Sequence, residues 1–92
     1  MSIKVRFFAR FRELLGTDLI IDYPAGATLA PFIRDIAMKN QDGCDALFDE
    51  HGTFREFVIV MRNGKRIEHK DTATLPLADG DEIAIFPPVA GG

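Results

Sequence analysis

The stretch DGDEIAIFPPVAGG, residues 79–92, decides how the rest of the chain is interpreted. At its centre the apolar Ile83 and Ile85 share one side, which is the period of a half-buried strand. An acidic turn precedes this strand, predicted over residues 82–86, and two prolines end it, since neither can donate a hydrogen bond to a sheet ladder. The stretch therefore predicts a last strand that leads directly into a short tail.

A second alternating stretch, residues 3–8, opens the chain with apolar residues at its odd-numbered positions. Phe8 breaks the pattern, because it is apolar on the polar side, and Phe86 faces outward from the last strand in the same way. If the two strands are neighbours, we expect their rings to form an exposed apolar patch beside the tail. Ile59 or Met61 extends this patch if a third strand lies alongside. A contiguous apolar patch usually marks an interface.

The segments between these strands predict the remaining elements by their periodicity and their turn residues. In the first half of the chain we expect a helical turn over 9–15 closed by Gly16, a hairpin strand over 19–23 and a helix from the N-cap Thr28 to near Asn40. A loop over 41–43 and a helical turn over 44–48 follow. In the second half we expect a strand over 57–61, a tight turn at Asn63-Gly64, an edge strand over 65–67 and an irregular stretch over 71–78 with Leu75 and Leu77 in the core. This order predicts an α+β fold with one helix on one face of a sheet.

Length and composition exclude several classes of protein. Ninety-two residues suit a single domain. Eleven basic and fourteen acidic residues give a net charge of −3, which argues against a protein that binds nucleic acid or an anionic membrane. Cys44 is the single cysteine, so an internal disulfide or a Cys-rich zinc site is excluded. Because no signal-peptide pattern and no apolar run near ~20 residues is present, we expect a cytoplasmic protein.

The sequence contains no conventional catalytic set. It has neither a phosphate-binding Walker loop nor a GxGxxG motif. His51 and His69 stand alone in polar stretches without a cysteine or histidine partner at ligand spacing, so we expect exposed loop histidines and no metal site. Catalysis by this chain alone is therefore not expected.

The tail, residues 87–92, is the unusual feature, and we treat it as separate from a domain over residues 1–86. Pro87-Pro88 favours an extended exit, and the tail can reach about 20 Å. Gly91 and Gly92 lack side chains, so they can enter a narrow channel. A terminal carboxylate, with a pKa of about 3.3–3.7, is ionised at neutral pH and is a poor electrophile. Another protein must activate it, because this chain has no nucleotide site.

The ending at residues 79–92, joined to KVRFFARFRELLG at residues 4–16, resembles the signature of the MoaD family. Members of that family are ubiquitin-like sulfur carriers, best known as the small subunit of molybdopterin synthase. The resemblance covers the whole chain and is weakest between Asn40 and Glu56. It implies a β-grasp fold, in which a mixed sheet of about five strands carries one main helix on one face and ends in a flexible Gly-Gly tail.

The resemblance also implies a chemistry. A ubiquitin-activating-type enzyme, using ATP and Mg²⁺, adenylates the carboxylate of Gly92, and a sulfur donor converts the adenylate into a thiocarboxylate. Gly91 keeps the tail slim, and the tail enters the large subunit of molybdopterin synthase, where the sulfur passes to the pterin precursor. The implied partner-binding residues are Phe8, Phe86, Pro87, Pro88, Val89 and Ala90. The chain itself would be a non-catalytic subunit without a cofactor of its own.

A second function stays open on the sequence. Arg62 precedes Asn63-Gly64 where family members often carry an uncharged residue, and residues 60–64 look more like the small archaeal modifier proteins. Those proteins share the fold and the ending, but their activated glycine is also joined to lysines of other proteins. Carriers for thiazole synthesis are usually shorter and lack the FPPV motif, which ranks them lower. A small interaction domain with an inert tail is the remaining interpretation.

Overall fold

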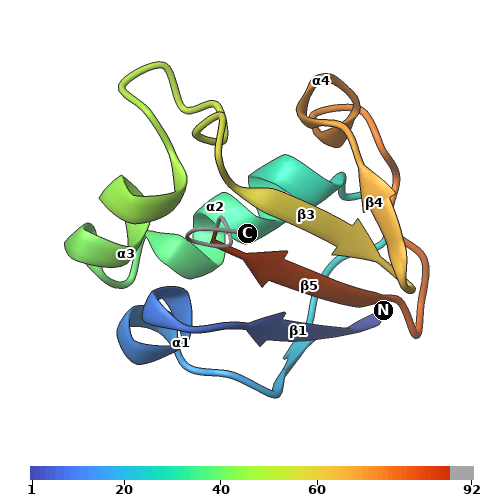
Figure 1. Ribbon diagram of the computed structural model, residues 1–92. Coiled ribbons are helices and arrows are strands. Elements are labelled where there is room, and N and C mark those ends of the chain that lie inside the picture. The colour runs from blue at the N-terminus through green and yellow to red at the C-terminus, as the bar shows by residue number, and fades with distance from the viewer. Residues whose placement is uncertain (88–92) are drawn as a thin grey trace.

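A mixed sheet of five strands forms the centre of the computed structural model, which describes residues 1–87 (Figure 1). The strands follow the order β2-β1-β5-β3-β4 across the sheet. Their bounds are β1 Ser2–Phe7, β2 Leu19–Asp22, β3 Ile59–Arg62, β4 Lys65–Ile67 and β5 Glu82–Phe86. The α+β fold and the number of strands agree with the prediction. The predicted tail lies outside the described residues except for Pro87.

The first and last strands are neighbours in the middle of the sheet. β5 runs parallel to β1 and antiparallel to β3. Val5 lies beside Ile83 and Phe7 lies beside Ile85, so the two alternating patterns are in phase. All four side chains are fully buried. Since a slip of one residue would turn them all to the opposite face, this apolar alternation fixes the register.

Helix α2, Leu29–Ala37, covers one face of the sheet, and Figure 1 views the sheet from the opposite face. The core between them consists of Leu29, Phe32, Ile33, Ile36 and Ala37 from the helix and Ile3, Val5, Phe7, Val60, Ile83 and Ile85 from the strands. The predicted helix after Thr28 is therefore confirmed, and its buried residues recur at helical spacing on the side that faces the sheet. Thr28 takes the N-cap position, but its side chain makes no capping hydrogen bond. Among residues 1–87, no helix is long and apolar enough to cross a membrane.

Two short helices, α1 Arg10–Leu15 and α3 Gln41–Leu47, pack together at one end of the sheet. The sequence predicted that α2 would continue to near Asn40 and that a loop would follow, and both predictions are wrong. The Asn40 side chain caps α3 instead, since its Oδ1 accepts hydrogen bonds from the backbone N–H groups of Asp42 and Gly43 at 3.0 and 3.2 Å. This cap starts a new helix at the position where a loop was predicted.

Gly43 lies inside α3 because it contacts α1 closely. A Cβ atom at this position would lie 2.5 Å from Cδ2 of Leu15. The Nδ2 of Asn40 also donates a hydrogen bond to the carbonyl oxygen of Leu14, at 2.8 Å. Gly43, which the sequence assigned to a loop, is therefore the point of contact between two helices.

The strand predicted over 57–61 begins later than expected, at Ile59. The backbone N–H of Val58 donates to the carbonyl oxygen of Arg55 at 2.9 Å, which closes a turn before the strand. Phe57 lies in this turn and is 48% exposed. The apolar run thus contains two residues that do not belong to the sheet.

The Asn63-Gly64 turn between β3 and β4 is confirmed, because both residues have a positive φ, of 52° and 81°, as a type I′ turn requires. The stretch predicted to be irregular over 71–78 starts within a short helix, α4 His69–Thr72. Thr72 is buried there, and its hydroxyl donates to the carbonyl oxygen of His69 at 2.7 Å. Leu77 is buried in the core as predicted.

Candidate functional site

The two outward-facing phenylalanines of the central strands lie against each other. Phe8 follows β1 and Phe86 ends β5, and their ring centroids are 4.2 Å apart with the ring planes within 12° of parallel. Ile59 of β3 is directly opposite Phe86 in the antiparallel register, so it shares the same face of the sheet. We call these three residues, Phe8, Phe86 and Ile59, the aromatic patch. The prediction that the strands bring the two rings together is confirmed.

The exposure of the aromatic patch is smaller than predicted. Phe8, Phe86 and Ile59 are each half-buried rather than exposed. Stacking explains this result, because each ring removes one face of the other from water. Met61, which was also expected to extend the patch, lies opposite Ala84 and continues the same face along the strands.

The backbone holds Phe8 in place from two sides. Its N–H donates to the carbonyl oxygen of Ile85 at 3.2 Å, and its own carbonyl oxygen accepts from the N–H of Phe11 at 3.1 Å. Ala9 then turns the chain into α1 with a φ of 53°, a conformation that residues with a side chain rarely adopt. The sharp turn directly after Phe8 fixes the ring at the end of β1.

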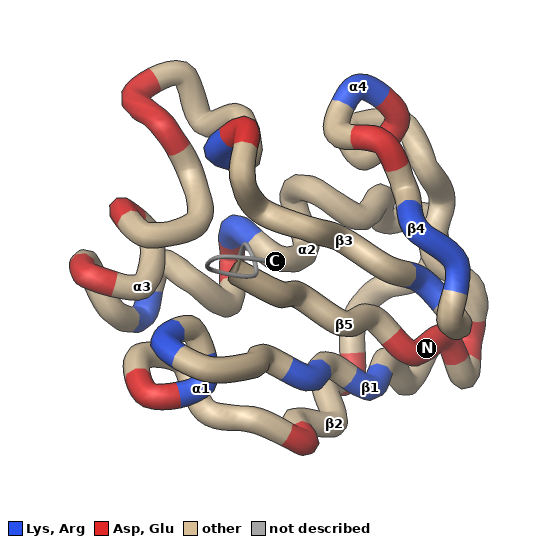
Figure 2. Tube along the Cα trace, in the orientation of Figure 1, with Lys and Arg blue, Asp and Glu red and all other residues tan. Residues whose placement is uncertain are grey.

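Arg6 forms the charged edge of the aromatic patch. Its Nε lies 3.1 Å from Oδ1 of Asp18, and its Nη1 lies 3.9 Å from Oε1 of Glu82. Its guanidinium carbon is 5.4 Å from the centroid of the Phe8 ring, within the range of a cation–π contact. Figure 2 shows basic segments on β1 and β4 on either side of the largely uncharged β5 and β3. An apolar centre with a polar rim is the usual composition of a protein interface.

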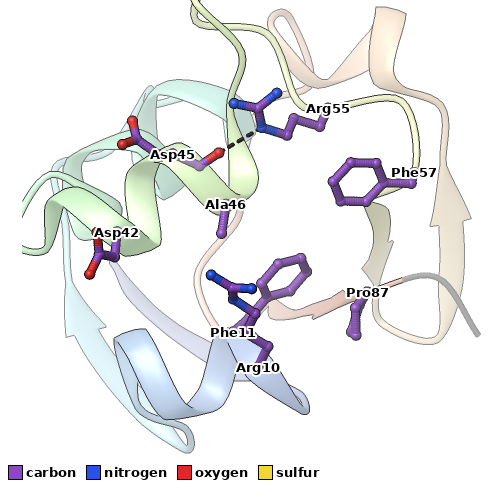
Figure 3. A pocket seen from close by; sticks show the side chains of 8 residues that line it. All are labelled: Arg10, Phe11, Asp42, Asp45, Ala46, Arg55, Phe57 and Pro87. Atoms are coloured by element: carbon purple, nitrogen blue, oxygen red, sulfur yellow. Dashed lines mark hydrogen bonds between the residues drawn. The ribbon is translucent and has the colours of Figure 1, made fainter.

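The described chain ends at the mouth of a groove. Pro87, the first residue of the predicted tail, lines this groove together with residues of α1, of α3 and of the turn before β3 (Figure 3). The groove has a volume of about 380 Å³ and is lined by Arg10, Phe11, Asp42, Asp45, Ala46, Arg55, Phe57 and Pro87. Apart from Pro87, these residues could not be identified as a site from the sequence, because three separate segments contribute them and no motif connects them.

The predicted site residues thus fall into two groups. The structure brings Phe8, Phe86 and Pro87 to one end of the central strands. The other predicted site residues lie outside the described part of the chain; they are Pro88, Val89, Ala90, Gly91 and Gly92.

The histidines are not part of the aromatic patch. His51 is exposed, as predicted, and its Nε2 lies 3.6 Å from Oε1 of Glu50. His69 differs from the prediction of an exposed loop residue, because it begins α4, contacts the carbonyl oxygen of Val58 through Nε2 and packs against Phe54 at a centroid distance of 5.8 Å. Within residues 1–87, no group of three or more histidine, cysteine or acidic side chains is arranged to hold a metal ion.

Two side chains outside the aromatic patch have shifted pKa values. The hydrogen bond from the Tyr23 hydroxyl to the Asp35 carboxylate raises the pKa of Tyr23. The backbone N–H groups of Thr53 and His51 donate to the Asp49 carboxylate and lower its pKa. Since both lie outside the patch and the groove, these shifts bear on local stability.

The family model described as the ThiS family matches residues 5–92. The chain belongs to the ThiS family. Two curated relatives match this ThiS-family protein over all or nearly all of its sequence. Small archaeal modifier protein 3 of Haloferax volcanii is 37% identical over 93 residues and covers all of both chains. The molybdopterin synthase sulfur carrier subunit of Escherichia coli is 39% identical over 93 residues, covering 98% of this chain and 99% of the relative.

Solved structures agree with this membership and establish the ubiquitin-like β-grasp fold of the ThiS-family chain. The crystal structure of SAMP1 from Haloferax volcanii has a TM-score of 0.83 at 27% identity and covers all of both chains. A protein–protein complex of subunits 1 and 2 of molybdopterin-converting factor from Helicobacter pylori contains a chain with a TM-score of 0.64 at 26% identity, again with full coverage of both.

Proposed function

We propose that this protein is a ubiquitin-like sulfur carrier for molybdopterin biosynthesis whose reactive group is the carboxylate of Gly92. The observation that carries this proposal is the end-to-end similarity to a molybdopterin synthase sulfur carrier subunit, with the aromatic patch beside the exit of the tail. The protein does not itself catalyse the reaction in this proposal. It holds no cofactor, and it acts in the cytoplasm.

The chemistry follows from the weakness of a carboxylate as an electrophile. A carboxylate oxygen of Gly92 attacks the α-phosphorus of ATP on a Mg²⁺-dependent adenylating enzyme, and pyrophosphate leaves. Sulfur from a donor at the sulfide oxidation level then attacks the carbonyl carbon, and AMP leaves. One carbon–oxygen bond is thereby replaced by a carbon–sulfur bond, without a change in the oxidation state of carbon. The resulting thiocarboxylate carries the sulfur.

The aromatic patch serves as the docking surface for the large subunit of molybdopterin synthase in this proposal. A chain of similar fold occurs in a complex of two molybdopterin-converting factor subunits. Stacked rings beside a charged rim supply the apolar anchors that dominate binding energies in interfaces. While the patch docks, the tail enters the active site of the partner. Gly91 and Gly92 are carried there by the four residues before them, Pro87, Pro88, Val89 and Ala90.

A second candidate function is protein modification. The similarity to small archaeal modifier protein 3, which also runs from end to end, favours it. The same acyl adenylate serves both functions, because the ε-amine of a lysine can attack the carbonyl carbon in place of sulfide. The product is then an isopeptide bond, AMP is again the leaving group, and one protein can have both functions.

The test is the covalent state of Gly92 in cells. The protein, tagged at its N-terminus, is purified from its native host under denaturing conditions, and its intact mass and tryptic peptides are measured. We expect the mass increase that accompanies replacement of one carboxyl oxygen by sulfur, located at Gly92. Larger species with Gly92 joined to lysines of other proteins would establish the modifier function. A variant without Gly91 and Gly92 is the control and should show neither product.

A chain that stays unmodified under several growth conditions would contradict both functions. The same conclusion would follow if the adenylating enzyme of the same organism formed no adenylate on Gly92 in the presence of ATP and Mg²⁺. The protein would then be a small interaction domain.

A further inference from the structure

We propose that the groove beside Pro87 is a binding site for the C-terminal segment of this same chain, residues 88–92, and that it holds the carboxylate of Gly92 when no partner is bound. This inference rests on the proposed function, in which the Gly92 carboxylate is the reactive end. It adds a resting state in which the reactive end is sheltered on the surface of its own domain.

Distance and connectivity favour this occupant. Pro87 is itself a lining residue, so the chain leaves the sheet at the groove. Five further residues span at most about 17 Å, which is enough to cross a groove of about 380 Å³. An attached segment also has an effective concentration of about the millimolar range, so weak contacts suffice to bind it.

The floor of the groove suits small apolar side chains. Phe11 is buried beneath it, and Ala46 adds a small apolar surface. Phe57 forms one wall and is 48% exposed, an unusual exposure for a large aromatic side chain. Val89 and Ala90 are the apolar residues of the C-terminal segment, and they come two and three residues after Pro87, which lines the same groove as Phe57.

The charges at the groove suit a carboxylate. Arg55 is fixed by its Nε, which donates to the carbonyl oxygen of Asp45 at 2.6 Å, and its remaining N–H groups are further possible donors. Arg10 forms no ion pair with any of the residues 1–87. Figure 3 shows its guanidinium beside the Phe11 ring, inside the circle of lining side chains. A guanidinium offers parallel N–H donors that match a carboxylate.

Asp42 and Asp45 keep this binding weak. Both line the groove, although Figure 3 shows their carboxylates pointing away from the circle of lining side chains. Their charges offset part of the charge of the two arginines, which lowers the affinity of the groove for the segment, while the attachment at Pro87 keeps the groove occupied. A low affinity suits the proposed function, since the adenylating enzyme has to draw the segment out.

The test measures the motion of the C-terminal segment in the isolated protein. Amide ¹⁵N relaxation of Ala90 and Gly91 is recorded in the full chain, in Arg10→Ala and in Arg12→Ala, a control on the same helix whose exposed side chain does not line the groove. We expect order parameters above about 0.6 in the full chain and in the control, and values below about 0.6 in Arg10→Ala. Because Arg10 is exposed, its removal should leave the spectrum of the folded domain intact.

Each other result overturns the proposal. Order parameters below about 0.6 in the full chain would leave the groove to a partner protein. Equal values in Arg10→Ala and the full chain would show that the groove does not hold the carboxylate of Gly92. A fall in the order parameters on tenfold dilution would assign the groove to the segment of a second copy. The relaxation measurement needs no activating enzyme, so a negative result there leaves the proposed sulfur-carrier function intact. Conversely, an unmodified Gly92 in the mass measurement leaves the binding of the C-terminal segment to the groove intact.

Discussion

Phe7 and Phe8 are adjacent in the sequence and lie on opposite faces of the same sheet. Phe7 is fully buried between the sheet and α2, where it stabilises the fold. Phe8 is half-buried on the face that α2 does not cover, where it stacks on Phe86. Residue type does not separate these two roles. The phase of the strand decides which aromatic side chain belongs to the core and which remains available to a partner.

A second stacked aromatic pair lies in the core and can be compared with Phe8 and Phe86. Phe48 and Phe54 also stack, with ring centroids 4.5 Å apart, and both are buried. Their geometry is similar to that of Phe8 and Phe86, but other core side chains surround them. The two pairs therefore differ in how much of each ring a partner protein can still contact. Three experiments test this difference, beginning with the largest expected effect, and a fourth concerns a side chain outside both pairs.

Substitution of Phe7 should have the largest effect on stability. Phe7→Ala creates a cavity in the core and should lower the free energy of unfolding by about 3–5 kcal/mol, as measured by urea denaturation. Phe8→Ala should cost less than half as much, because its ring is already partly in water. If Phe7→Ala does not fold, Phe7→Leu provides a measurable intermediate. Equal losses at the two positions would contradict the assignment of the two faces.

Substitution of Phe86 should affect partner binding while the fold is kept. Phe86→Arg places a charge in the centre of the aromatic patch and should weaken binding to the large subunit of molybdopterin synthase about 100-fold, or about 2.7 kcal/mol. Calorimetric titration measures this change, and circular dichroism checks the fold. Met38→Arg is the matched control, because Met38 is 68% exposed and follows α2 rather than a central strand. An unchanged affinity for Phe86→Arg would exclude the patch as the interface.

The coupling energy between the two rings should be smaller than these effects and similar in the two stacked pairs. A double-mutant cycle with Phe8→Ala and Phe86→Ala should give a coupling of about 0.5–1.5 kcal/mol. The same cycle for Phe48 and Phe54 should give a similar coupling but much larger single losses. A coupling near zero for Phe8 and Phe86 would mean that the stack contributes no energy of its own.

The smallest effect should come from Asp49, which belongs to neither face. Its pKa is lowered, first by the N–H of Thr53, so the charged form is favoured in the folded state. The stabilisation is therefore present above the unfolded pKa of about 3.9 and is lost as the pH falls through the lower, folded pKa. Unfolding measured against pH should show a difference from Asp49→Ala that is constant at neutral pH and shrinks below about pH 4. A difference that grows in acid would contradict this sign.

The sequence predicts the central strands of the sheet better than the helices and turns around them. The alternation of β1 and β5 and the turn at Asn63-Gly64 are local patterns, and the structure places each of them as expected. Gly43 was misassigned to a loop because its reason for being glycine is a contact with Leu15, far away in the sequence. Phe57 was misassigned to a strand because a turn at Val58 is not visible in an apolar run.

The aromatic patch was predictable, because two outward-facing rings on alternating strands leave a visible break in each pattern. The groove was not predictable, since Arg10, Arg55 and Phe57 meet only through tertiary packing. Residues that break a local pattern can be found from sequence alone, whereas residues that only meet in space cannot.

The central position of β5 also determines how the domain withstands a pull. β5 is hydrogen-bonded to β1 on one side and to β3 on the other. A force applied beyond Phe86 in the direction of the strand must shear both rows of hydrogen bonds at once. A strand at the edge of the sheet would instead be peeled away one bond at a time. A partner protein can therefore pull on the segment after Phe86 without unfolding the domain.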